Sequence, residues 1–286
     1  MTASLLELDH VVKRFATGGL LARRQITAVH EVSFTLTRER PEIFAIVGES
    51  GSGKSTLANM ILGTLAPSGG VLRFAGRDIA AIRSRVDREA FMAKVQPVFQ
   101  NPFEAFNPLT RIEDYLFATA RRFCGATRAA EAHRVADAAL QHVGLSLAEL
   151  RGRFAHELSG GQLQRIAVAR ALIAKPQLIV ADEPVSMVDA SLRMSIVNLF
   201  RALRDDLGVS IIYITHDLAT TYHISDRVII MQQGHVVESG PARAVLSNPS
   251  HAYSIALKNA VLPPDPLLAA RMIRPADPAR PVSPAG

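Results

Sequence analysis

Residues 48–55 read Gly-Glu-Ser-Gly-Ser-Gly-Lys-Ser and lie between an apolar run, Ile43 to Val47, and a helix-like stretch, Thr56 to Leu65. The pattern G-x-x-x-x-G-K-S/T between a strand and a helix is typical of a loop that binds a polyphosphate. Its glycines let backbone N–H groups point at the phosphates, the lysine reaches the β- and γ-phosphates, and the following serine ligates the magnesium ion that they carry. The sequence therefore predicts a site for a nucleoside triphosphate and magnesium. Its candidate binding residues are Gly48, Ser50, Gly51, Ser52, Gly53, Lys54, Ser55 and Thr56.

Composition limits the class of protein. The chain has 286 residues, 48% of them hydrophobic, which is enough for one large core or for a core and a smaller subdomain. No apolar stretch reaches the ~18 to 20 residues of a membrane span, and the N-terminus lacks a charged region followed by an apolar one. We therefore expect a chain that neither spans a membrane nor is secreted. Its single cysteine, Cys124, excludes an internal disulfide.

The net charge of +6 raises the question of a nucleic-acid partner. The basic residues are dispersed as pairs, such as Arg23-Arg24 and Arg121-Arg122, and no basic stripe with interleaved aromatic residues is visible. We therefore expect a solvated surface and no nucleic-acid binding.

Hydrophobic periodicity predicts the organisation of the chain. The first 47 residues read as short strands, residues 101–157 are helical in pattern, and later apolar strands alternate with helices. Alternating strands and helices imply an α/β fold with a mostly parallel sheet covered on both faces. Seven of the 16 prolines follow residue 262, which predicts a tail without regular packing. The expected division is an ATPase domain over residues 1–262, with a helical subdomain at about 101–160, and a Pro-rich tail over 263–286.

Three further segments follow the phosphate loop in a characteristic order. They are Leu158-Ser159-Gly160-Gly161-Gln162-Leu163-Gln164-Arg165, the apolar run Leu178 to Ala181 closed by Asp182-Glu183-Pro184, and Ile211 to Thr215 closed by His216-Asp217. Together they resemble the signature, the Walker B strand and the switch strand of ABC-transporter ATPases, over roughly residues 5 to 262. The resemblance implies a phosphate-loop (RecA-like) core with an antiparallel β subdomain and a helical subdomain insert.

Catalytic residues are expected at the carboxyl ends of the strands, where ligands bind in open parallel sheets. Asp182 would hold magnesium directly or through water, together with Ser55, and Glu183 would accept a proton from the attacking water. Alone, Glu183 could equally be a surface acid at the end of a strand. The resemblance further implies that His216 contacts the γ-phosphate and helps to fix the glutamate and the water.

Two more residues take roles from the resemblance. Gln100, in Phe99-Gln100-Asn101-Pro102, matches the glutamine that approaches the magnesium ion and the water beside the transmembrane partner. The alternative is a polar turn before Pro102. Phe15 matches an aromatic residue that stacks on adenine, although a phenylalanine in a small sheet is as often part of the core.

The signature residues act on a neighbouring subunit in this family. The resemblance implies that Ser159, Gly160, Gly161 and Gln162 face the nucleotide of a second ATPase domain, so that two ATPs lie between two subunits, and that Asp189 crosses the same interface. Here Met187-Val188 stands where Ala-Leu is more common, and Leu163 stands where a basic or amide side chain is common. We expect neither departure to abolish hydrolysis.

Within the superfamily, the chain looks most like the ATP-binding subunits of oligopeptide, dipeptide and nickel importers. The segments that carry this resemblance are 47–50, 100–102 with 106–108, 156–159 and the C-terminal segment Asn248-Pro249-Ser250-His251-Ala252-Tyr253. The expected partners are two permease subunits, a second ATPase that is a homologous chain or a second copy, and a solute-binding protein. The expected location is the cytoplasmic face of the inner membrane. Some members of this group carry cysteines for an iron–sulfur cluster in the C-terminal extension. This chain has no cysteine there, so we expect ATP and Mg²⁺ as cofactors and no iron–sulfur cluster.

Other classes of function remain open. One is a soluble ABC ATPase that acts on nucleic acid or ribosomes, and another is a nucleotide-binding subunit that does not hydrolyse ATP. Soluble ABC proteins generally carry paired ATPase units, zinc-binding cysteines or long charged linkers, none of which is visible here. The combination of Lys54, Asp182, Glu183 and His216 argues against the second class.

Overall fold

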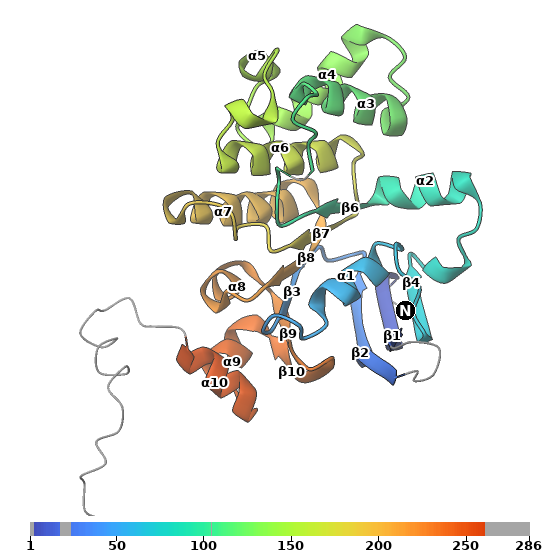
Figure 1. Ribbon diagram of the computed structural model, residues 1–286, viewed down its shortest axis with the longest axis vertical. Helices are drawn as coiled ribbons and strands as arrows, with labels where there is room; N and C mark the ends of the chain where they lie inside the picture. The colour runs from blue at the N-terminus through green and yellow to red at the C-terminus, as the bar shows by residue number, and fades with distance from the viewer. Residues whose placement is uncertain (1–2, 18–23, 104, 261–286) are drawn as a thin grey trace, which may run out of the picture.

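Figure 1 shows the computed structural model, which describes residues 3–17, 24–103 and 105–260. Its centre is a six-stranded sheet in the order β10-β9-β3-β8-β7-β6, parallel except for the β10-β9 pair. The strands are β3 (Ile43–Val47), β6 (Val95–Val98), β7 (Leu178–Asp182), β8 (Ser210–Thr215), β9 (Arg227–Gln232) and β10 (His235–Pro241). The expectation of a mostly parallel sheet is confirmed.

Alternate residues of the central strands belong to different hydrophobic cores, which explains their continuous apolar runs. In β8, Ile211 and Tyr213 pack with the helices of one face, whereas Ile212 and Ile214 pack with the helix and sheet of the other. Both faces of the sheet are therefore covered. Polar side chains that could act on a ligand are therefore expected at the ends of the strands.

The second sheet is antiparallel, in the order β2-β1-β4-β5. Its strands are β1 (Ser4–Thr17), β2 (Arg24–Thr37), β4 (Gly69–Phe74) and β5 (Arg77–Asp78). Residues 32–36 alternate between the core and solvent, since Val32, Phe34 and Leu36 are buried whereas Ser33 and Thr35 are exposed. The prediction of short strands is wrong for β1 and β2, which each run for 14 residues because they pair with each other through several register shifts.

Helices surround the central sheet. The 3₁₀ segment η1 (Ile79–Ala81) and α2 (Arg85–Lys94) precede β6, and α1 follows the phosphate loop on the face shared with the antiparallel sheet. The bounds of α1 and of the later helices are α1 (Lys54–Ile61), α7 (Ala190–Leu207), α8 (Leu218–Ile224), α9 (Ala242–Ser247) and α10 (Ala252–Ala260). Within the part of the chain that the structure describes, none of the helices has both the length and the apolar character that a membrane crossing requires.

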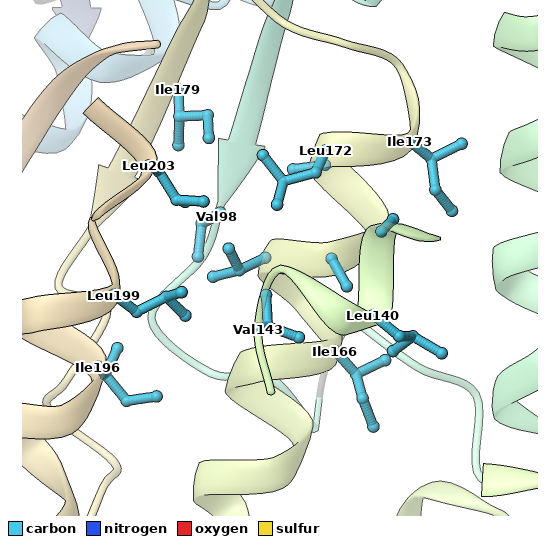
Figure 2. Packing of buried hydrophobic residues seen from close by; sticks show 14 of the residues in the cluster. Val98, Leu140, Val143, Ile166, Leu172, Ile173, Ile179, Ile196, Leu199 and Leu203 are labelled. Atoms are coloured by element: carbon cyan, nitrogen blue, oxygen red, sulfur yellow. The ribbon is translucent and has the colours of Figure 1, made fainter. Parts of the chain in front are cut away.

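A helical subdomain stands at one end of the molecule, drawn in green at the top of Figure 1. It contains α3 (Ile112–Cys124), α4 (Ala129–Gln141), α5 (Leu147–Leu150) and the 3₁₀ segment η2 (Ala155–Glu157), and it rests on α6 (Gly160–Ile173). Figure 2 shows Leu140 and Val143 of this subdomain beside Ile166 of α6, with Ile196, Leu199 and Leu203 of α7 to their left. The expected tail, residues 263–286, lies outside the described residues.

Candidate active site

The phosphate loop leaves the end of β3 and is clamped between two other strands. A Cβ atom on Gly48 would lie 2.2 Å from the carbonyl oxygen of Met231 in β9. A Cβ atom on Gly53 would lie 2.3 Å from the carbonyl oxygen of Ala28 in β2, and Gly53 also has φ +101° as the N-cap of α1. The loop can approach both strands only because these positions lack side chains.

Lys54 is held in the middle of this loop. Its ammonium donates hydrogen bonds to the carbonyl oxygens of Gly48 and Glu49, both at 2.7 Å, and the side chain is buried. Burial lowers the pKa of Lys54, and the carboxylates of Glu183 and Asp182 act in the opposite direction. A buried cation thus stands where the negative charge of a polyphosphate would be favourable.

Asp182 and Ser55 offer oxygen atoms at the edge of the sheet. Burial raises the pKa of the Asp182 carboxyl, while a hydrogen bond from the Ser55 hydroxyl and the charge of Lys54 lower it. Mg²⁺ prefers oxygen ligands, and proteins usually supply one or two of them beside the phosphates of the substrate. A carboxylate whose charge is disfavoured by burial and an adjacent hydroxyl therefore fit a magnesium ion.

Glu183 and His216 form a pair at the ends of β7 and β8. Glu183 Oε1 lies 3.1 Å from His216 Nδ1, the glutamate side chain being 19% exposed and the histidine 62%. The backbone of Glu183 has φ +46°, and its N–H donates to the Ile214 carbonyl oxygen at 2.8 Å. Two adjacent carboxylates thus have different surroundings, as two different roles require.

Most of these groups border one cavity of about 970 Å³, although Gly48, Ser52 and Asp182 do not line it. The lining includes most of the phosphate loop, Gln100 after β6, and the Glu183 and His216 pair. The candidate residues from four strand ends therefore meet at one edge of the sheet, as the parallel topology requires. The lining residues of the candidate set are Ser50, Gly51, Gly53, Lys54, Ser55, Thr56, Gln100, Glu183 and His216.

Phe15 lies elsewhere. It sits on β1 opposite Ile26, is 37% exposed, and has the Lys13 ammonium 5.3 Å from the centre of its ring. It does not line the cavity beside the phosphate loop. Stacking of Phe15 on adenine stays a prediction.

The signature residues form a second group, away from this cavity. The Ser159 hydroxyl accepts the Gln162 N–H at 3.2 Å, and the Gln162 side chain accepts the Ser159 N–H at 3.0 Å, so the two residues make a capping box at the start of α6. A Cβ atom on Gly160 would lie 3.2 Å from the Met187 carbonyl oxygen, and one on Gly161 would lie 3.0 Å from Leu192. The signature thus packs on the segment around Asp189, which is exposed at the N-cap of α7.

Several residues that line the cavity were not predicted from the sequence. Arg193 of α7 lines the cavity with its guanidinium 3.6 Å from the Asp217 carboxylate, and Asp217 caps α8 by accepting the Ala219 N–H at 2.8 Å. An aspartate just before a helix is a recognisable N-cap, so Asp217 had a signal. Leu257 and Ala260 of α10 also line the cavity, and nothing in the local pattern indicated it.

Comparison with known proteins gives a consistent answer. A family model described as ABC transporter matches residues 29–186. The oligopeptide transport ATP-binding protein OppF of Salmonella typhimurium is 41% identical over 232 residues, which cover 81% of this chain and 69% of that protein. OppF of Bacillus subtilis is 36% identical over 266 residues, covering 93% of this chain and 85% of that protein.

Solved structures agree on the fold. The ATP-binding cassette MJ0796, in a dimeric post-hydrolysis state bound to ADP and Pi, superposes with a TM-score of 0.73 at 26% identity, over 83% of this chain and 99% of that chain. CbiO1 of Clostridium perfringens, part of the cbiONQ ABC transporter complex, gives 0.73 at 25% identity, over 94% of this chain and 99% of its own. The chain therefore belongs to the ABC transporter family, as one of its ATP-binding ATPases.

Proposed function

We propose that this chain powers a membrane importer for peptides or a related small solute. The relatives at 36% and 41% identity are named as oligopeptide transport ATP-binding proteins, and similarity to the B. subtilis protein extends over 93% of the chain. The choice of peptide as cargo rests on these relatives. The coupling to ATP rests on the site.

The observation that carries the proposal is the Glu183 to His216 pair, 3.1 Å apart beside the cavity that the phosphate loop borders. Lys54 binds the β- and γ-phosphates and stabilises their charge. Glu183 accepts a proton from the water that attacks the γ-phosphate, and His216 holds the glutamate and the γ-phosphate in position. Gln100 reaches the same cavity from the end of β6.

Magnesium completes the proposed site. Ser55 and Asp182 would hold the ion, with Gln100 close to it, and the ion would neutralise charge on the phosphates. The half-buried Asp182 carboxyl, whose pKa burial raises, supports this assignment because a cation would offset the cost of that burial.

We further propose that two ATPase subunits close on two nucleotides. Ser159, Gly160, Gly161, Gln162 and Asp189 lie together and outside the cavity of their own chain. The N-terminus of α6 offers N–H groups and a partial positive charge suited to an anion from a second subunit. The second subunit is a homologous chain or another copy, and hydrolysis reopens the pair.

In the complete system, the two ATPases act on two permease subunits, and a separate binding protein delivers the solute. The chain would then lie at the cytoplasmic face of the inner membrane, attached through the permeases. The segment after Gln100 would meet them and link hydrolysis to their movement.

The test is purification of the tagged full chain from gently solubilised native membranes, with identification of the co-purifying proteins by mass spectrometry. The expected result is two polytopic membrane proteins and a second ATPase, and MgATPase activity of the complex that rises when its binding protein and a peptide mixture are added. Recovery of only soluble or ribosomal partners, under conditions that preserve a known transporter, would contradict the importer and favour a soluble ABC protein.

A further inference from the structure

The C-terminal helix α10 touches the phosphate loop. The Glu49 N–H donates a hydrogen bond to the Tyr253 hydroxyl at 2.9 Å, across 204 positions of sequence. Leu257, one helical turn further on, lines the nucleotide cavity with Ala260. A segment far from every nucleotide-binding motif thus forms part of the site.

The same turn of the loop is also held by Lys54. The carbonyl oxygens of Gly48 and Glu49 accept hydrogen bonds from Lys54, and the Glu49 carbonyl also accepts the Ser52 N–H at 3.2 Å. The backbone of Glu49 is therefore held at its carbonyl oxygen by Lys54 and Ser52 and at its N–H by Tyr253. The hydrogen bond to Tyr253 uses the Glu49 N–H, whereas Lys54 bonds to carbonyl oxygens. The contact with Tyr253 can therefore persist when the Lys54 ammonium binds a phosphate.

Helix α10 is itself firmly placed. Glu238 of β10 accepts hydrogen bonds from the Ser250 N–H at 2.8 Å, the Ser250 hydroxyl at 3.1 Å and the His251 N–H at 3.3 Å, all just before the helix begins. Tyr253 and Leu257 pack on the apolar cluster that contains Val47 at the end of β3. The tyrosine is thus held in place by its packing on this cluster and by an anchored helix start, and partial burial raises the pKa of its hydroxyl.

We propose that Tyr253 is a positioning residue for the phosphate loop, through which α10 sets the affinity for nucleotide. The inference rests on the proposed role of Lys54 and its loop in ATP binding. A loop held in its binding geometry before the ligand arrives binds more tightly, because less ordering accompanies binding. A movement of α10 would accordingly alter the affinity for ATP without touching Glu183 or His216.

The test is a Tyr253→Phe variant of the full chain, which keeps the ring and removes the hydroxyl. We expect the Kd for MgADP, measured by calorimetric titration, and the KM for ATP to rise about three- to tenfold, the range for one hydrogen bond, while kcat stays within about twofold. Tyr222→Phe, at an exposed position on α8, is the matched control and should leave both constants unchanged.

A second variant separates positioning from general stability. Glu238→Gln weakens the anchor of α10 and should raise the same Kd by a smaller factor, and the double variant should be no weaker than Tyr253→Phe alone, because both changes act through one contact. A Tyr253→Phe variant with a lower melting temperature but an unchanged Kd and KM would overturn the inference. Lys54→Ala separates the proposed nucleotide site from the proposed role of Tyr253. If Lys54→Ala and Tyr253→Phe both leave the Kd unchanged, the phosphate-loop site is refuted. If only Lys54→Ala loses binding, the site stands and the role of Tyr253 is refuted.

Discussion

Glu183 has a left-handed backbone conformation. A glutamate at φ +46° is uncommon, and it directly follows the regular strand that ends at Asp182. The Ser186 hydroxyl and N–H both bond to its carbonyl oxygen, at 3.0 and 3.2 Å, which holds the unusual conformation. The strained backbone and the contact with His216 distinguish this carboxylate from that of Asp182, which is consistent with the separate role proposed for it.

Replacing Glu183 with Gln should therefore separate binding from hydrolysis. The amide is nearly isosteric and cannot accept the proton of the attacking water, so turnover should fall by ~10² to 10⁴, which corresponds to ~3 to 5 kcal/mol of barrier. Nucleotide affinity should stay close to that of the wild type. A steady-state ATPase assay beside a nucleotide titration measures both, and near-normal turnover would refute the role of Glu183 as the base.

Comparing Gly53 with Gly125 tests whether the close contact between the phosphate loop and β2 requires a glycine. Both have positive φ, but a Cβ atom on Gly53 would lie 2.3 Å from the Ala28 carbonyl oxygen, whereas a Cβ atom on Gly125 would meet nothing within 4 Å. Gly125→Ala should cost about 1 kcal/mol of unfolding free energy from backbone strain alone. Gly53→Ala should cost at least about 2 kcal/mol more and abolish nucleotide binding, as denaturant unfolding and a binding titration would measure. Equal costs at the two positions would show that the loop can move away from β2.

At the scale of elements, the start of α6 has a structural role and a proposed functional one. The capping box of Ser159 and Gln162 satisfies N–H groups at the helix start, and the same end of the helix is proposed to face a phosphate of a second subunit. A substitution by alanine would disturb both roles together. Substitution by aspartate keeps the helix cap and disturbs only the proposed contact with phosphate.

Ser159→Asp should keep the fold and lose the activity. Aspartate is as good an N-cap as serine, so the melting temperature should hardly change, whereas Ser159→Ala should cost about 1 kcal/mol. The added negative charge would oppose a γ-phosphate, so ATPase activity should fall at least about tenfold in the aspartate variant. Full activity of Ser159→Asp, measured at several enzyme concentrations, would contradict a phosphate contact across the interface.

Most helices and strands, and the site residues at the strand ends, follow from the local pattern of apolar and polar residues. The apolar runs that end at Val47, Asp182 and Thr215 predicted both the strands and the edge at which their polar neighbours meet, because parallel strands share one direction. The contact between Tyr253 and Glu49 spans 204 positions and leaves no periodic trace, so it could not be predicted. The length of β1 and β2 depended on the pairing of one strand with the other, which local alternation does not reveal.

At the scale of the whole molecule, Arg227 joins the two sheets. Its guanidinium donates to the Thr35 carbonyl oxygen of β2 at 3.0 Å and to the Glu42 carboxylate at 3.2 Å, from the first residue of β9. Glu42 is 7% exposed, and burial raises its pKa in spite of the charge of Arg227. The buried carboxylate therefore costs stability in its charged form even though it is paired.

The pH dependence of stability follows from the sign of that shift. A pKa raised in the folded state means that the folded chain binds more protons than the unfolded chain just above pH 4.5, so this group lowers stability as the pH rises through its folded pKa. Glu42→Gln keeps an acceptor for Arg227 without the charge, and should raise the melting temperature at pH 7.5 by roughly 1 to 3 °C, with a smaller gain near pH 4.5.

The control for this measurement is Glu39→Gln, which removes the same charge at an exposed position and should show neither effect. Thermal melts of the three proteins across this pH range make the comparison. A destabilised Glu42→Gln variant at pH 7.5 would mean that attraction to Arg227 outweighs the cost of burial.

The strand β6 has a consequence for how copies of this molecule can meet. It is the last strand of the central sheet, only four residues long, and it contains Pro97, which has no N–H to donate. A short edge with a missing donor is a poor template for a strand from another molecule. Permanent assembly by continuing the sheet is thereby discouraged at this edge, which leaves contacts between loops and helix ends. Contacts of that kind can form and separate repeatedly, which suits the proposed cycle in which hydrolysis reopens the pair of subunits.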